Sequence, residues 1–96
     1  MVDMTFSWDD DKAAENLRRH RVSFEEAMTA FSDENARLIH DPDHSEQEDR
    51  FILLGISSRL RVLVVCHTYR QDDHEIRIIS ARRAIRRERR QYGSFL

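Results

Sequence analysis

The chain has 96 residues, of which 35% are charged and 40% hydrophobic, with only two Gly and one Pro. This length supports one small domain over residues 1–96, and the composition excludes fibrous, low-complexity and disordered proteins. The formal net charge is −2, but charge is unevenly distributed along the chain. Residues 1–49 carry 5 basic and 14 acidic side chains, whereas residues 50–96 carry 11 basic and 4 acidic side chains. Such a division predicts a basic surface that meets an anionic partner.

A short strand and two helices are predicted in the first third of the chain. Residues 5–8 alternate between polar and aromatic side chains, which is typical of a strand. Asp9 is the predicted N-cap of a helix that runs to about His20. Ser23 and Glu26 match a capping box at the start of a second helix, which is expected to bury Phe24, Ala27, Met28 and Phe31.

Strands dominate the remainder of the predicted structure. Apolar runs of strand length occupy residues 38–40, 50–56, 62–69 and 75–80, separated by polar turns. A last helix is expected to open at Ser80 or Ala81, with an apolar stripe made by Ala81, Ala84, Ile85 and Tyr92. The order β-α-α-β-β-β-β-α predicts an α+β domain with a mostly antiparallel sheet, two N-terminal helices and a C-terminal helix.

A possible catalytic set lies just before the strand at residues 50–56. If this segment is extended, His44, Glu46, Glu48 and Arg50 share one face, because the side-chain period of a strand is two. Cleavage of RNA by its own 2′-hydroxyl needs a base, an acid and positive charge on the phosphorane, which His, Glu and Arg can supply. A solvated charged loop explains the same spacing, so the motif alone leaves both interpretations open.

Arg77 interrupts an otherwise apolar, β-branched strand. A charge in a central strand has to reach solvent or pair with an anion, since an unpaired buried charge is costly. That anion is either a bound phosphate or a carboxylate of the chain itself, with Glu48 and Asp49 as the internal candidates.

The segment from Arg82 to Arg90 contains six Arg in nine residues. Arg-rich helices bind phosphate backbones without reading sequence, so Arg82, Arg83 and Arg86 are candidate RNA contacts. Tyr92 follows on the apolar stripe, where it either packs in the core or contacts RNA. His and Cys residues match no standard zinc spacing, so neither a metal nor a cofactor is expected. The single cysteine, the absence of a signal-peptide pattern and the absence of a membrane-length apolar run predict a cytoplasmic protein without membrane contact.

Several motifs occur together along most of the chain: Phe6-x-Trp8-Asp9, His20-x-Val22-x-Phe24, His44-Ser45-x-x-Glu48-x-Arg50-Phe51, Leu54-Gly55 and Arg77-Ile78-Ile79-Ser80-Ala81-Arg82. With them the chain resembles the BrnT family of toxins from bacterial type II toxin–antitoxin pairs. The resemblance implies a RelE-like fold and a metal-independent endoribonuclease that inhibits translation. Arg21 departs from the family pattern, because a Gly is expected after the His that ends the first helix.

Carried over residue by residue, the resemblance favours His44, Glu48, Arg50 and Arg77 as catalytic residues, with either His44 or Glu48 as the base. It gives Arg82, Arg83 and Tyr92 supporting roles near the RNA. It also implies a BrnA-like antitoxin that forms a hetero-oligomer with the toxin and supplies the DNA contact. The alternative function is a non-catalytic module that binds RNA or a partner through the Arg-rich C-terminal half.

Overall fold

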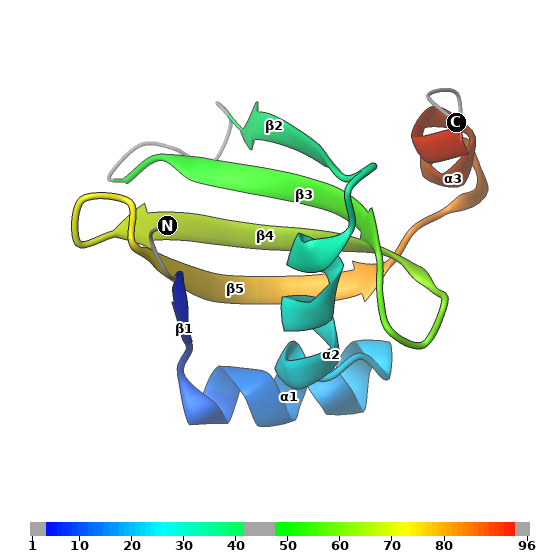
Figure 1. Ribbon diagram of the computed structural model, residues 1–96. Coiled ribbons are helices and arrows are strands. Elements are labelled where there is room, and N and C mark those ends of the chain that lie inside the picture. Colours follow the sequence, from blue (N-terminus) through cyan, green and yellow to red (C-terminus); the bar gives the residue numbers. More distant parts are fainter. Residues whose placement is uncertain (1–3, 42–47, 94–96) are drawn as a thin grey trace.

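A computed structural model describes residues 4–41 and 48–93 of the chain. Three helices, a 3-10 turn and five strands follow one another in the predicted order (Figure 1). Their bounds are β1 Thr5–Ser7, α1 Asp10–His20, α2 Phe24–Thr29, η1 Ala30–Ser32, β2 Arg37–Asp41, β3 Arg50–Ile56, β4 Val62–Arg70, β5 Glu75–Arg83 and α3 Arg86–Gly93. Within the described ranges, none of the helices is both long and apolar enough to cross a membrane.

The five strands form one sheet in the order β1-β5-β4-β3-β2. Strands β2 to β5 pair antiparallel with their neighbours in sequence, and only the three-residue β1 pairs parallel, with β5. This architecture confirms the predicted α+β class. The register between β4 and β5 shifts between Cys66 and His67, which leaves Ile79 as an extra residue in a β-bulge.

Both N-terminal helices begin at the predicted caps. The Asp9 carboxylate accepts hydrogen bonds from the backbone N–H of Asp11 and Lys12, and the Ser23 hydroxyl accepts one from Glu26. Arg21 is the C-cap that follows α1, with φ 59° and ψ 31°, and it donates its backbone N–H to the carbonyl of Leu17. This left-handed conformation favours Gly, so Arg21 carries the strain that its departure from the family pattern predicts.

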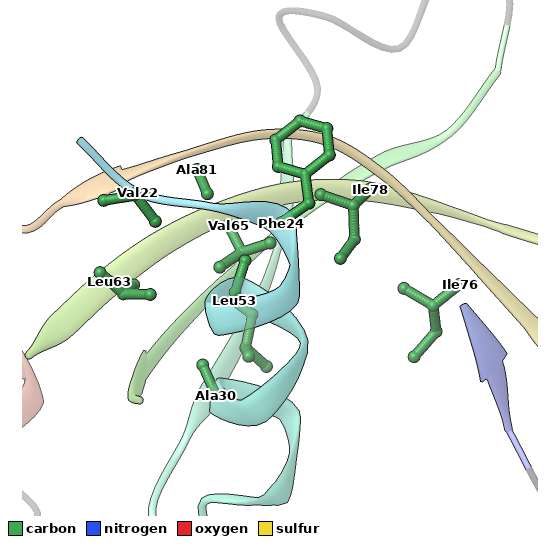
Figure 2. Close-up of a cluster of buried hydrophobic side chains, with 10 residues drawn as sticks. Val22, Phe24, Ala30, Leu53, Leu63, Val65, Ile76, Ile78 and Ala81 are labelled. Carbon is green, nitrogen blue, oxygen red and sulfur yellow. The ribbon is translucent and has the colours of Figure 1, made fainter. Parts of the chain in front are cut away.

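The helix α2 and the turn η1 cover one face of the sheet, called here the covered face, while α1 lies along the β5 edge (Figure 1). The contact between these elements and the sheet contains most of the buried hydrophobic side chains in the described ranges (Figure 2), namely Val22, Phe24, Ala27, Ala30, Leu53, Leu63, Val65, Ile76, Ile78 and Ala81. A Cβ on Gly55 would lie 2.9 Å from the carbonyl oxygen of Ala30. Gly at this position therefore lets η1 approach β3 closely.

The sequence pattern of α1 did not indicate its most buried residue, Asn16. Its side-chain amide donates to the carbonyls of Val22 at 2.9 Å and Ala81 at 2.8 Å, while its oxygen accepts from the Ala81 N–H at 3.1 Å. Because β1 pairs only with residues 75–77 of β5, the outer edge of β5 has no strand beside it at Ala81. Asn16 replaces the missing strand there and fixes α1 to the sheet.

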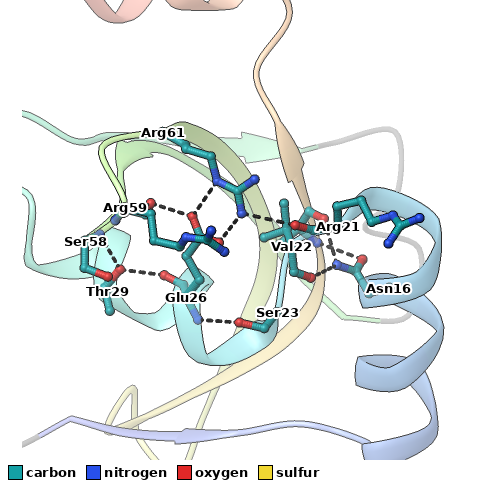
Figure 3. A network of polar contacts seen from close by, with 11 residues as sticks. Asn16, Arg21, Val22, Ser23, Glu26, Thr29, Ser58, Arg59 and Arg61 are labelled. Carbon is teal, nitrogen blue, oxygen red and sulfur yellow. Dashed lines mark hydrogen bonds and ion pairs between the residues drawn. The ribbon is translucent and has the colours of Figure 1, made fainter.

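A buried ion pair joins α2 to the turn between β3 and β4 (Figure 3). The Glu26 side chain is about 5% exposed and accepts from both Nε and Nη2 of Arg61, and from the Ser57 hydroxyl at 2.6 Å. Arg61 also donates to the carbonyl of Arg21 at 3.1 Å. Only half of the predicted capping box therefore forms, because the Glu26 carboxylate turns away from Ser23 toward Arg61.

The C-terminal helix begins later than predicted. Ala81, Arg82 and Arg83 continue β5, opposite Val65, Val64 and Leu63 of β4, and the helix starts only at Arg86. Pairing with β4 and burial of Ala81 in the core outweigh the helix propensity of these residues. Accordingly, the predicted stripe is wrong at Ala81 and at Ile85, which is 51% exposed.

A buried aromatic cluster surrounds His67 on the covered face. His67 is fully buried, and its ring lies against Phe31, Phe51 and Tyr69 at centroid distances of 4.8, 6.2 and 5.1 Å. Its ring nitrogens lie 3.1 Å from the Val65 carbonyl and 3.2 Å from the Tyr69 hydroxyl. Burial lowers the pKa of His67, although the Val65 carbonyl opposes the shift.

His67 therefore makes stability fall in mild acid. The unfolded chain takes up a proton at His67 below the ordinary pKa of histidine near 6.5, whereas the folded protein does not, because its pKa is lower. The free energy of unfolding therefore does not depend on His67 above pH ~6.5, and below that pH it falls by up to ~1.4 kcal/mol per pH unit. Urea unfolding between pH 8 and 5 measures this slope. We expect His67→Gln to flatten it and the exposed control His74→Gln to keep it; equal slopes in both variants would contradict the assignment.

Candidate active site

The sheet face opposite α2, called here the open face, carries the predicted catalytic arginines. Since Leu53 and Ile78 point to the covered face, the alternation along each strand directs Arg50 and Arg77 to the open face. At one end of this face α3 is anchored through Ala84 and Tyr92, which pack with Leu54, Val64, Ile52, Ile56 and Val62. The other end is left for polar side chains.

Those polar side chains line a pocket of about 110 Å³, called here the basic pocket. It combines four cationic and two acidic side chains with two isoleucines: Lys12, Arg50, Arg70, Arg77, Asp9, Glu48, Ile78 and Ile79. Three predicted catalytic residues, Glu48, Arg50 and Arg77, are thus brought together. An excess of positive charge in a small concave site attracts an anion of phosphate size.

Several different elements hold these side chains in place. Arg50 begins β3 and Arg70 ends β4, while Arg77 lies within β5 between Ser7 of β1 and Thr68 of β4. Lys12 reaches the pocket from the first turn of α1, where the Asp9 cap fixes its backbone N–H. The pocket therefore forms only when the sheet and α1 have assembled.

Ion pairs near the pocket leave one arginine without a carboxylate. Glu48 pairs with Arg70 at 3.6 Å, and Asp49 lies 3.3 Å from the His40 ring. Neither acid meets Arg77, and across residues 4–41 and 48–93 the Arg77 guanidinium forms no hydrogen bond or ion pair. The internal salt bridge considered from the sequence is therefore not formed, and the half-buried Arg77 is available to a bound anion.

The two remaining residues of the predicted catalytic face, His44 and Glu46, lie outside the described residues. A role for His44 as base stays a prediction. Glu48 is exposed at the pocket and pairs there with Arg70.

The predicted RNA contacts divide into two kinds. Arg82 donates to both carboxylate oxygens of Glu88, at 2.8 and 2.9 Å, and the same carboxylate accepts from the Ile85 N–H at the start of α3. Tyr92 is buried and donates to Asp33 at 2.6 Å, and burial together with this carboxylate raises the pKa of Tyr92 to about 12. These two residues anchor α3, whereas Arg83 and Arg86 are exposed.

Two cations of the basic pocket were not predicted from the sequence as site residues. Lys12 is the only lysine of the chain, and Arg70 follows an apolar strand much as Arg50 precedes one. Neither lies near the predicted site residues in sequence, so Lys12 reaches the pocket only through the packing of α1 on β5, and Arg70 only through the pairing of β3, β4 and β5. In the described part of the chain, no group of three His, Cys, Asp or Glu side chains could hold a metal ion.

Comparison with known proteins gives a family match and a structural match. The family model described as "Ribonuclease toxin, BrnT, of type II toxin-antitoxin system" matches residues 8–88. Among solved structures, the 1.1 Å crystal structure of the Brucella abortus ribonuclease toxin BrnT is similar with a TM-score of 0.66 and 20% sequence identity, covering 86% of this chain and 99% of that chain. At this identity the structural match supports the fold alone. The search of curated proteins gave no match.

Proposed function

Because the chain belongs to the BrnT family of ribonuclease toxins of type II toxin–antitoxin systems, we propose that it cleaves RNA in the basic pocket without a metal ion. The observation that carries this proposal is Arg77, a half-buried cation without a carboxylate partner in the described chain, beside Arg50, Arg70 and Lys12. A phosphodiester with two anionic charges in its phosphorane transition state is the ligand that such a group stabilises.

The proposed reaction is an internal transfer of the phosphoryl group. A base removes the proton of the 2′-hydroxyl, the 2′-oxygen attacks phosphorus, and the bond to the 5′-oxygen breaks as that oxygen takes up a proton. The products are a 2′,3′-cyclic phosphate and a 5′-hydroxyl. His44 and Glu48 are the proposed proton-transfer groups, while Arg50 and Arg77 stabilise the phosphorane and Lys12 and Arg70 neutralise the adjoining phosphates.

We also propose a BrnA-like antitoxin as the partner of the toxin in a hetero-oligomer. Type II family membership implies an antitoxin, and the antitoxin would bring the complex to DNA. The exposed arginines at the end of β5 and on α3 offer it a basic surface that complements an acidic partner: Arg83, Arg86, Arg87, Arg89 and Arg90. The same five arginines are the observation that favours the alternative function, in which the chain binds RNA or a partner without cleaving RNA.

Cleavage of a defined RNA by the purified protein in EDTA tests the proposed reaction. We expect full activity with excess chelator and fragments that end in a 2′,3′-cyclic phosphate. Activity that is lost in EDTA and restored by a divalent cation would contradict the metal-independent mechanism. Binding of the RNA without any cleavage would favour the alternative function.

A further inference from the structure

A second pocket of about 240 Å³ adjoins the basic pocket on the open face. The two pockets are continuous, because Arg50 and Ile79 line both of them. Ile79 is the bulge residue of β5, so the irregularity in the sheet lies where the pockets meet. Bulges next to active sites commonly redirect a side chain toward the ligand.

The second pocket has an apolar floor and a polar rim. Ile52, Val64 and Cys66 supply the floor from β3 and β4, with Ile79 from β5, and the rim consists of Asp41, Ser80 and Arg82 beside Arg50. Its volume lies below the range of about 300–1,000 Å³ found for sites of drug-sized ligands. Space of this size and character suits one planar ring system with polar edges.

We propose that this pocket takes a base of the RNA whose phosphate lies in the basic pocket, and that Asp41 selects guanine. Enzymes that act on RNA unstack bases against apolar side chains and read their Watson–Crick edges by hydrogen bonds. A carboxylate is an acceptor only. The Watson–Crick edge of guanine offers two neighbouring donor groups, N1–H and the 2-amino group, whereas those of cytosine and uracil each offer one. This inference rests on the proposed function, since it assigns a subsite to the same substrate.

The position of Asp41 supports this reading. Asp41 ends β2 directly opposite Arg50 in the antiparallel register, and both residues line the second pocket, which Arg50 connects to the basic pocket. Burial raises the pKa of the Cys66 thiol in the floor, while the charge of Arg50 lowers it and that of Asp41 raises it, so both charges lie near the floor. A base resting on this floor would therefore bring its edge to the carboxylate and its phosphate to the basic pocket.

Cys66, the only cysteine of the chain, reports on occupancy of the floor. Burial raises the pKa of its thiol, so alkylation with iodoacetamide is followed at pH 9. We expect saturating guanosine 3′,5′-bisphosphate to slow alkylation at least about 10-fold, and inorganic phosphate at the same concentration to slow it less than about 2-fold. The cytidine analogue should need about 10-fold more nucleotide for the same protection, the factor expected for one lost charge-assisted hydrogen bond.

Asp41→Asn is expected to reduce the preference for guanosine to about one, whereas Asp49→Asn, an exposed acid outside the pocket, should keep it. Calorimetric titration of the wild-type protein with both bisphosphates gives the same ratio without relying on Cys66. Equal protection by phosphate and by both nucleotides, or no protection at all, would overturn the proposal. If the protein cleaves RNA but guanosine 3′,5′-bisphosphate does not protect Cys66 from alkylation, the base pocket alone is overturned. If the nucleotide protects Cys66 but the protein does not cleave RNA, the proposed reaction alone is overturned.

Discussion

Replacing Arg77 with Ala should lower the single-turnover rate of RNA cleavage by about 10- to 150-fold, because a charge-assisted contact to the phosphorane contributes ~1.5–3 kcal/mol. The loss should be catalytic rather than structural. Arg77 pairs with no carboxylate in the described chain, so its removal leaves no buried charge uncompensated. Arg50→Ala should lower the rate by a similar factor, since Arg50 lines both pockets of the open face.

Thermal unfolding and an arginine outside the pockets provide the controls. Arg18→Ala removes an exposed charge from α1 and should keep the wild-type rate. Arg77→Lys keeps the charge but loses the planar fork, so its rate should lie between those of the wild type and Arg77→Ala. If Arg77→Ala cleaves as fast as Arg18→Ala, or if it unfolds while Arg77→Lys remains fully active, Arg77 is a structural residue.

The largest effect on stability is expected at the ion pair between Glu26 and Arg61. Removing one partner of a buried pair leaves the other charge without compensation, which costs ~3–5 kcal/mol. Because the Arg61 side chain is 21% exposed, we expect Arg61→Ala to lose about 3 kcal/mol of unfolding free energy in urea titrations at pH 7. The neighbouring Arg59→Ala is the matched control, since Arg59 is exposed, and it should lose less than about 0.5 kcal/mol.

The ion pair also makes the contribution of Glu26 to stability depend on pH. Burial raises the pKa of Glu26, but hydrogen bonds from Arg61 and Ser57 outweigh it and the net shift is downward. Because the folded pKa of Glu26 is depressed, its stabilisation is fully present above the unfolded pKa near 4.3 and is lost as the pH falls through the folded pKa.

A double-mutant cycle tests whether Glu26 and Arg61 stabilise the fold through each other. The variant that combines Glu26→Gln with Arg61→Ala should lose less unfolding free energy than the sum of the two single variants; strict additivity would show that the pair contributes nothing.

Sequence patterns predicted strands and helix starts well where the local preference of a segment agrees with its packing in the fold. The apolar run from Arg50 to Ile56 coincides with β3, and the caps at Asp9 and Ser23 begin α1 and α2 as expected. The pattern failed at Arg82 and Arg83, which are good helix formers drawn into β5 by pairing with β4. Helix propensity could not reveal this, because the decisive partner lies about twenty residues earlier in the chain.

The candidate site could be predicted only in part for the same reason. Arg77 stands out in the sequence as a charge within an apolar strand, and Glu48 and Arg50 follow from the two-residue period. Lys12 and Arg70 enter the pocket through the assembly of α1 with β5 and of β3 with β4, which no local pattern encodes. Asn16 and Glu26 are likewise buried polar residues whose partners, Ala81 and Arg61, are remote in sequence.

The measurement that tests the central claim most directly is a crystal structure of the protein with an RNA oligonucleotide that carries 2′-deoxyribose at the cleavage site. Without the attacking hydroxyl this RNA binds but is not cleaved. The account predicts that the scissile phosphate lies in the basic pocket, within about 2.7–2.9 Å of guanidinium nitrogens of Arg77 and Arg50. A phosphate bound along the exposed arginines of α3, with the basic pocket left to solvent, would contradict it.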